Sequence, residues 1–283
     1  QSVGKTSRKN CGACHFYGGG GDAVKHGDLD STMTNPGIEL DVHMDAKGLN
    51  FSCAECHTTG SHEVTGSRYA TKAVDKNGID VPGRTDDTRA TCESCHGLTP
   101  HEKDAKLNDH TDRVACQSCH IPEFARGGRP TKMMWDWSTA GQLNDKGKPV
   151  VKKTADGKEN AYDGMKGDFR WEENVVPEYR WFNGVIKYTL MGEKIDDAGG
   201  VVPINRLEGS AADPDSRIWP FKRMEGKQPY DKATNQLLIP HTYGDYRRML
   251  ERDDIDLVSV CVPNFLHHEV VLAAAKAGKH VVC

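Results

Sequence analysis

The sequence lacks any hydrophobic run that approaches the roughly 20 apolar residues needed to span a lipid bilayer. Only 36% of its 283 residues are hydrophobic, which is little for a packed core of that length. It also lacks a basic excess, because 37 lysines and arginines stand against 41 acidic residues. The resulting net charge of −4 gives no argument for binding nucleic acid or an anionic membrane surface. A chain this polar needs a large apolar cofactor if it is to fold rather than stay disordered.

Cysteine is absent from the first 240 residues except within four Cys-x-x-Cys-His pentapeptides. Two thiols at this spacing can reach two vinyl groups of one haem, and the following histidine can bind the iron. One such motif would leave a zinc knuckle or a redox-active thiol pair open, but four copies with histidine in fifth place favour haem. The sequence therefore predicts four covalently bound haem c groups. The predicted attachment residues are Cys11, Cys14, Cys53, Cys56, Cys92, Cys95, Cys116 and Cys119, with proximal iron ligands His15, His57, His96 and His120.

Low-spin haems need a second axial ligand, and most remaining histidines lie within the haem-bearing stretch from 11 to 120. His62 and His101 follow His57 and His96 at the same offset of five residues. A histidine so near its own proximal ligand must serve a neighbouring haem, because the chain has to pass around the macrocycle edge. The predicted distal ligands are His26, His43, His62, His101 and His110. His241 is a weaker candidate, and Lys25 is an outside candidate for an amine ligand.

The motifs follow one another closely along the chain, which predicts closely packed haems and hence electron conduction. Turn signals such as Asn35-Pro-Gly37 and Pro82-Gly83 separate them. We expect a multihaem cytochrome c fold of mostly irregular loops, with short α-helices beginning at the motifs and wrapping the haems, and few strands.

Three regions follow from the pattern. Residues 1–130 form the tetrahaem region, and residues 131–240 form an aromatic-rich region that covers the haems and carries all five tryptophans. Residues 245–283 differ in kind, with buried strands expected at 256–262 and 280–283 and a helix at 269–277. Strand, helix and strand in this order predict a truncated Rossmann-like β-α-β fragment with parallel strands.

Haem is attached to such motifs outside the cytoplasmic membrane, so the chain is expected to be periplasmic or extracellular. Gln1–Lys5 lacks the charged and then apolar start of a signal peptide. We interpret this as a leader that has been removed, or as a chain that is an internal piece of a longer protein.

Residues 1–240 resemble the octahaem cytochromes of the tetrathionate reductase family. Beyond the haem motifs, the resemblance rests on Cys14-His-Phe-Tyr-Gly-Gly-Gly-Gly21, Lys25-His-Gly-Asp-Leu-Asp30, Leu40-Asp-Val-His-Met-Asp45, Trp135-Asp-Trp-Ser-Thr-Ala-Gly141, Arg180-Trp-Phe-Asn-Gly184 and Gly226-Lys-Gln-Pro-Tyr230. The resemblance implies a periplasmic protein with mainly bis-histidine haems, redox partners that are quinol-linked or periplasmic cytochromes, and reduction of tetrathionate, nitrite or hydroxylamine at a lysine-ligated haem. Four motifs stand where eight are expected, and no motif is assigned to that catalytic haem.

The last forty residues resemble the NAD(P)-binding domain of dehydrogenases related to glucose–fructose oxidoreductase and inositol dehydrogenase. The matching residues are Asp253-Asp-Ile-Asp-Leu-Val-Ser-Val-Cys-Val-Pro-Asn264, His267-His268 and Ala277-Gly-Lys-His-Val-Val-Cys283. No glycine-rich dinucleotide fingerprint precedes them, so we expect no NAD binding. We interpret residues 241–245 as a chimeric junction, with a genuine fusion as the alternative.

The leading functional hypothesis is an electron-transfer module of a periplasmic octahaem reductase. A non-catalytic conductor, including an extracellular cytochrome filament subunit, is the alternative within the haem class. A nicotinamide-dependent sugar dehydrogenase is the alternative from another class, and the missing glycine fingerprint disfavours it. The sequence leaves the substrate, the oligomeric state and the presence of a catalytic haem open.

A single-molecule read of the source DNA, from the codons of Asn205 onward, tests the junction. We expect the reading frame to leave the dehydrogenase-like tail and to continue into further Cys-x-x-Cys-His motifs. A read that passes through Cys283 into Glu-Lys-Pro would contradict the chimera and require a function for the tail.

Overall fold

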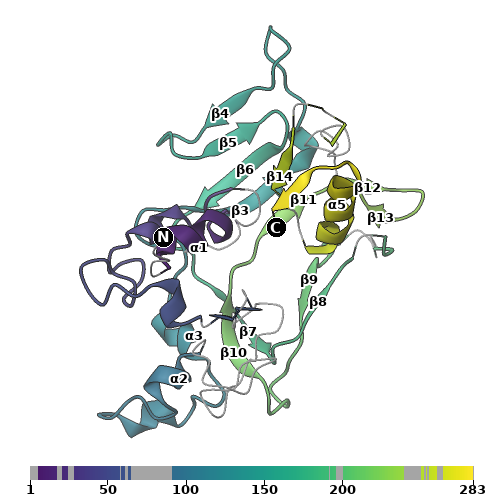
Figure 1. Cartoon of the computed structure of the whole chain (residues 1–283). Coiled ribbons are helices and arrows are strands. Elements are labelled where there is room, and N and C mark those ends of the chain that lie inside the picture. Colours follow the sequence, from purple (N-terminus) through teal and green to yellow (C-terminus); the bar gives the residue numbers. More distant parts are fainter. Residues whose placement is uncertain are drawn as a thin grey trace, which may run out of the picture.

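The computed structural model describes residues 6–17, 21–24, 29–57, 59–60, 63–64, 91–190, 192–195, 200–238, 250–251, 253, 255–259 and 264–282. Several sequence candidates lie outside the described residues, namely Lys25, His26, His62, His241, Cys261 and Cys283. Figure 1 shows the helices of the motif-bearing region gathered along one side of the molecule, with the strands beside them. Among the described residues, no helix is both long and apolar enough to cross a membrane.

Short helical segments coincide with all four motifs. They are α1 (Arg8–His15), η2 (Cys53–Glu55), α2 (Glu93–His96) and α3 (Cys116–His120), of which η2 is a 3₁₀ turn. Further 3₁₀ turns are η1 (Ser31–Thr34), η3 (Ala105–Asn108) and η4 (Trp137–Thr139). Their N-caps are Asp30, Asp104 and Asp136, each of which accepts a hydrogen bond from a backbone N–H two residues later.

The aromatic-rich region contains a five-stranded sheet in the order β11-β3-β6-β5-β4. Its strands are β3 (Thr131–Asp136), β4 (Val151–Lys153), β5 (Asn160–Asp163), β6 (Gly167–Glu172) and β11 (Glu225–Lys227). The β11–β3 pair is parallel and the other pairs are antiparallel. Trp135 pairs with Phe169 across β3 and β6, and their rings meet edge to face at 5.3 Å.

The expectation of few strands is wrong for this region. The remaining pairs there are β7 (Glu178–Phe182) with β10 (Arg217–Phe221), β8 (Ile186–Tyr188) with β9 (Asn205–Leu207), and β12 (Tyr230–Asp231) with β13 (Gln236–Leu237). A further pair joins β1 (Thr59–Gly60) to β2 (Glu63–Val64). Each strand spans only two to six residues, which is too few for an alternating hydrophobic pattern to be recognised in the sequence. These strands form because of contacts with strands from distant segments.

The C-terminal segment forms β14 (Leu257–Ser259), α5 (Asn264–Lys276) and β15 (His280–Val282). The two strands pair in parallel, in the expected order. The helix begins five residues earlier than predicted, and the first strand begins at Leu257 rather than at residue 256. The predicted strand residues 260–262 and 283 lie outside the described residues. The buried residues of its core are Leu250, Val258, Val270 and Ala274, all from this segment. The unit therefore packs against itself.

A buried charge network fastens the loop that follows the first motif to the sheet. Arg129 Nε donates to Asp30 Oδ2 at 2.9 Å, and its Nη2 donates to Asp22 Oδ2 at 2.5 Å. Thr131 Oγ1 donates to the Ala23 carbonyl at 3.1 Å, and Lys222 Nζ donates to the Val24 carbonyl at 3.2 Å. Asp30 is only 1% exposed, so its charge depends on this pairing.

Lys132 on β3 is buried within a cage of aromatic rings. Its Nζ lies 3.8 Å from the ring centre of Phe169, 4.6 Å from that of Trp135 and 4.9 Å from that of Trp171. The rings attract the ammonium group, but burial disfavours its charge and lowers the pKa of Lys132 from its ordinary 10.5 to about 8.

The Lys132 pKa predicts a stability that depends on pH. Between pH 8 and 10.5 the unfolded chain binds more protons at this lysine than the folded chain does, so the free energy of unfolding should rise with pH. Lys132→Met should remove this rise, as measured by chemical denaturation at pH 7.5, 9 and 10. Lys152→Met is the matched control, because Lys152 lies exposed over the Tyr162 ring at 5.2 Å. An identical rise in wild type and Lys132→Met would contradict the assignment.

Candidate haem-binding sites

One helical turn organises the two thiols and the imidazole of each motif. In the second motif, the His57 N–H donates to the Cys53 carbonyl at 2.9 Å, and in the third the His96 N–H donates to the Cys92 carbonyl at the same distance. Such a turn brings residues i, i+3 and i+4 to one face. In all four motifs the first cysteine is partly buried and the second is exposed.

Arg8 holds the first motif against the second. Its guanidinium donates to the Phe51 carbonyl at 2.7 Å, to Asn50 Oδ1 at 2.9 Å and to the Thr34 carbonyl at 3.2 Å. The thiols of Cys11 and Cys53 also lie close enough to interact. Burial and the neighbouring Cys11 together raise the pKa of the Cys53 thiol.

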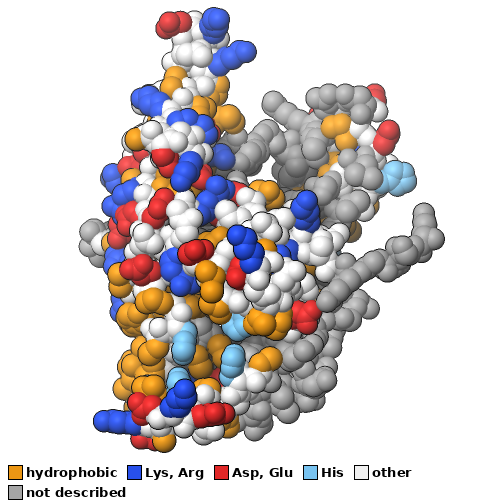
Figure 2. Space-filling view, turned by 90° about the vertical axis from the view of Figure 1, so that its left-hand side faces the viewer, with side chains coloured by type: hydrophobic (Ala, Val, Ile, Leu, Met, Phe, Trp, Pro, Cys, Tyr) orange, Lys and Arg blue, Asp and Glu red, His pale blue; other side chains and the backbone are white. Residues whose placement is uncertain are grey.

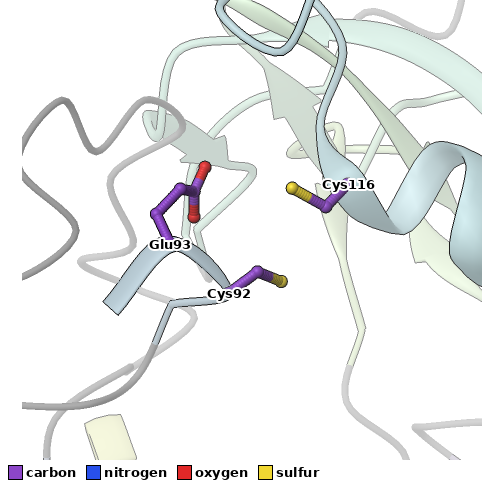
Figure 3. Close-up of side chains that lie close together, drawn as sticks. All are labelled: Cys92, Glu93 and Cys116. Carbon is purple, nitrogen blue, oxygen red and sulfur yellow. The ribbon is translucent and has the colours of Figure 1, made fainter. Parts of the chain in front are cut away.

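The third and fourth motifs meet in the same way. The Sγ atoms of Cys92 and Cys116 and a carboxylate oxygen of Glu93 all lie within 4.8 Å of one another (Figure 3). The hydrogen bond from the Cys92 thiol lowers the pKa of Cys116 to about 7, and the same bond raises the pKa of Cys92. Here too, the first cysteines of two motifs face each other.

Strand β10 holds both of these motifs through adjacent residues. The Ile218 carbonyl accepts from the Ala115 N–H at 3.0 Å and from Ser118 Oγ at 2.7 Å, which fixes α3. Arg217 pairs with Glu93 at the start of α2, and the two side chains are 5% and 8% exposed. The ion pair is therefore buried beside the two thiols that face each other.

Two histidine pairs have the separation that one iron between them requires. The ring centres of His43 and His96 are 6.0 Å apart with planes at 57°, and those of His101 and His120 are 6.0 Å apart with planes at 10°. Metal–imidazole bonds are about 2.0–2.1 Å long, so two imidazoles on opposite sides of one ion place their ring centres about 6 Å apart. The donors present thus fit bis-histidine haem.

This geometry does not fit a zinc knuckle. A knuckle needs the thiols and the histidine of its motifs to converge on one ion. Here the cysteines that converge come from different motifs, whereas His96 and His120 face His43 and His101. His101 is brought to the following motif rather than to its own, in the manner expected for a ligand that serves a neighbouring haem.

His110, another predicted distal ligand, does not lie beside a second histidine among the described residues. His110 is exposed, and its carbonyl accepts from the N–H groups of Arg113 and Val114 at 2.9 and 2.8 Å. Within the described part of the chain, no histidine ring pairs with that of His110. Three residues at these sites were not predicted from the sequence: Glu93, Arg217 and Asn108. For Glu93, a charged residue inside a haem motif was a possible signal. Arg217 and Asn108 act through tertiary contacts, which leave no local pattern in the sequence.

Apolar side chains are exposed around the paired histidines. Large examples in the motif-bearing region are Ile38, Val42, Leu49, Leu98 and Leu107. Figure 2 shows histidines among hydrophobic side chains on one face of the molecule. A macrocycle held between each histidine pair would cover such surface and contribute the apolar area that the composition lacks.

Comparisons with known proteins agree with this geometry. A family model described as bacterial cytochrome c matches residues 132–269. The crystal structure of an octahaem cytochrome c from Shewanella oneidensis is similar with a TM-score of 0.70 and 44% sequence identity, over 86% of this chain. Together with the site, these matches support a multihaem c-type cytochrome with haem c as its cofactor. Within that class, the likeness supports an octahaem cytochrome, of whose structure this chain spans 50%.

Curated proteins that match do so over short segments. A levoglucosan dehydrogenase of Pseudarthrobacter phenanthrenivorans is 36% identical over 52 residues, which are 18% of this chain and 13% of that protein. D-xylose 1-dehydrogenase (NADP(+)) 2 of Haloferax volcanii is 45% identical over 51 residues, which are 18% of this chain and 16% of that protein. The chain thus spans less than a fifth of either relative.

The buried ion pair gives a stability prediction. Arg217→Met leaves the Glu93 carboxylate buried without its partner and should lower the free energy of unfolding by about 3–5 kcal/mol. The double variant Arg217→Met/Glu93→Gln should lose less, because no uncompensated charge remains. Arg180→Met is the control, since its pair with Glu178 is exposed and such pairs contribute about 0–1 kcal/mol. Denaturant titration of the holoprotein measures all three; equal losses in the single and double variants would contradict the argument.

Proposed function

We propose that this chain is the electron-transfer part of a periplasmic octahaem reductase of the type that reduces tetrathionate, nitrite or hydroxylamine. The observation that carries the proposal is the pair of bis-histidine geometries, His43 with His96 and His101 with His120, built onto Cys-x-x-Cys-His turns. The likeness to an octahaem cytochrome c supports the wider context.

The residues have distinct roles in this proposal. The motif cysteines anchor four macrocycles as thioethers, and His15, His57, His96 and His120 bind the irons proximally. His43 is the distal ligand opposite His96, and His101 is the distal ligand opposite His120. His26, His62 and His110 stay candidates for the other distal positions. When bound, haem iron supplies reversible one-electron chemistry.

The contacts between first cysteines arrange the four sites as two couples. Cys11 with Cys53, and Cys92 with Cys116, fix neighbouring attachment points, which hold the edges of two macrocycles close together. His43 connects the couples, because it precedes the second motif in the chain and its ring contacts Phe51 at 6.1 Å, yet it faces His96 of the third motif. With haem bound at these sites, electrons could pass from one couple to the other, so that the centres would not be isolated.

The alternative is a conductor without catalysis, including a subunit of an extracellular cytochrome filament. Two bis-histidine geometries favour it for the sites concerned, because six-coordinate iron has no open position for a substrate. In the reductase proposal, the substrate is a small oxidised sulfur or nitrogen compound, and the lysine-ligated haem lies in another part of the whole protein. Redox partners are quinol-linked or periplasmic cytochromes.

The C-terminal segment has no role in this proposal. Among the described residues, its buried core consists of its own side chains, which supports a unit of separate origin. The short matches to a levoglucosan dehydrogenase and a D-xylose 1-dehydrogenase (NADP(+)) support the resemblance of part of this chain to dehydrogenases. Against a junction at 241–245 stands the bacterial cytochrome c match, which runs to residue 269. We propose no nicotinamide binding and hence no sugar dehydrogenase activity.

Spectroscopy of the intact protein tests the haem assignment. Mass spectrometry should show four covalent haems, and electron paramagnetic resonance should show low-spin iron at the two sites described. His101→Ala and His43→Ala should each convert one low-spin haem to a high-spin, five-coordinate haem that binds carbon monoxide when reduced.

The variant His110→Ala tests whether the exposed His110 is also an iron ligand. Unchanged low-spin signals in both His43→Ala and His101→Ala would rule out the ligand assignment. A high-spin or lysine-ligated signal in the wild type, with turnover of tetrathionate, nitrite or hydroxylamine, would place catalysis in this chain. Wholly low-spin haems without turnover would favour the conductor.

A further inference from the structure

Asn108 holds the His101 side chain through three hydrogen bonds. Its Oδ1 accepts from the His101 backbone N–H at 3.1 Å and lies 3.1 Å from His101 Nδ1, while its Nδ2 donates to the His101 carbonyl at 3.1 Å. Asn108 ends the η3 turn, seven residues after His101, and both residues are half-buried. The side-chain amide thus spans the backbone and the ring of one residue.

These contacts decide the tautomer of His101. A backbone N–H needs an acceptor and a backbone carbonyl needs a donor, so the orientation of the Asn108 amide is fixed with Oδ1 toward His101 Nδ1. Nδ1 must then carry the proton and donate it to Oδ1. Nε2 keeps the lone pair that a metal ligand needs, in the ring that lies 6.0 Å from that of His120.

The other distal candidate is held differently. His43 Nδ1 lies 3.8 Å from Asp41 Oδ1, beyond hydrogen-bond distance, and Asp41 binds the backbone N–H of His43 instead, at 2.8 Å. Of these two rings, that of His101 alone has a side-chain hydrogen bond to another described residue. The ring planes of His101 and His120 are nearly parallel, at 10°.

We propose that Asn108 is the positioning residue of the fourth haem site, setting the tautomer, the ring rotation and the basicity of the distal ligand His101. This inference rests on the proposed ligand role of His101. Partners that hold the second nitrogen of a metal-bound histidine typically change metal affinity by about 10–100-fold when they are removed. Asn108 would thereby keep one of the haems closed to small exogenous ligands and would set its reduction potential.

The test uses the holoprotein with its haems attached and carbon monoxide as the probe. In Asn108→Ala, the affinity of His101 for iron should fall about 10–100-fold, so one haem should bind carbon monoxide in the reduced protein. In Asn108→Asp, a carboxylate should accept the Nδ1 proton more strongly, so the haem should stay low-spin while its potential falls. Potentiometric titration followed by absorbance should show this shift in one haem.

Asp104→Asn is the matched control. Asp104 caps the same η3 turn by accepting from the Lys106 N–H at 3.2 Å, but it has no contact with His101 among the described interactions. We expect this variant to resemble wild type in carbon monoxide binding and in potential. If Asp104→Asn and Asn108→Ala have the same effect, or if Asn108→Ala opens more than one haem, the role is structural and the inference is wrong.

His101→Ala separates the two possible failures. If it opens one haem to carbon monoxide while Asn108→Ala and Asn108→Asp behave as wild type, His101 is a ligand but Asn108 does not position it. If His101→Ala also leaves all haems closed, the ligand assignment itself fails, and the role of Asn108 fails with it.

Discussion

The haem-bearing part of the chain has too few buried apolar side chains to form a core by itself. Among the described residues before 121, the buried hydrophobic side chains are Phe16, Ala23, Val24, Met33 and Ala115. At about 0.8 kcal/mol per buried CH₂, so few small side chains contribute little against the entropy of ordering many loop residues. Haem groups held by the paired histidines would supply both apolar area and iron–nitrogen bonds. The loops here depend on that contribution, and the rest of the architecture positions them for it.

The strand-rich region provides the rigid frame on which these loops are mounted. Arg129 and Lys222 hold the loop after the first motif, and Ile218 and Arg217 of β10 hold the fourth and third motifs. Contacts of this kind join residues that are 99 to 198 positions apart in the chain. The frame is therefore more than a cover over the haems: it determines which motifs face each other.

The sequence predicted the chemistry of the motifs better than their arrangement. Cys-x-x-Cys-His fixes a local helical turn through residues four apart, so its form could be read directly from spacing. The short distance from His101 to its own proximal ligand predicted a role at a neighbouring haem, but it did not predict the approach of His101 to His120. His43 precedes the second motif in the chain and His96 follows it, so no local sequence pattern predicts that these two rings pair. Roles at His26 and His62 stay predictions, since these residues lie outside the described part of the chain.

The strand content was underestimated for a related reason. β7 and β10 join residues 178–182 to residues 217–221, and each strand alone is short and rich in aromatic or charged side chains. Their stability comes from contacts such as Phe182 against Phe221, with ring centres 5.3 Å apart at 88°, which depend on register rather than on local propensity. The ion pair of Arg217 and Glu93 likewise joins residues that are far apart in the sequence.

The two described histidine pairs differ in a manner that bears on electron flow. The His101–His120 planes are nearly parallel and Asn108 holds one ring, whereas the His43–His96 planes are inclined at 57° and His43 lacks such a lock. Hydrogen bonding to an axial imidazole increases its basicity and stabilises ferric iron. If both pairs hold haem as proposed, the two centres therefore have unequal potentials. The Cys92–Cys116 contact brings the attachment points of these two sites together, so haem at the His43 side would be the easier of the two to reduce.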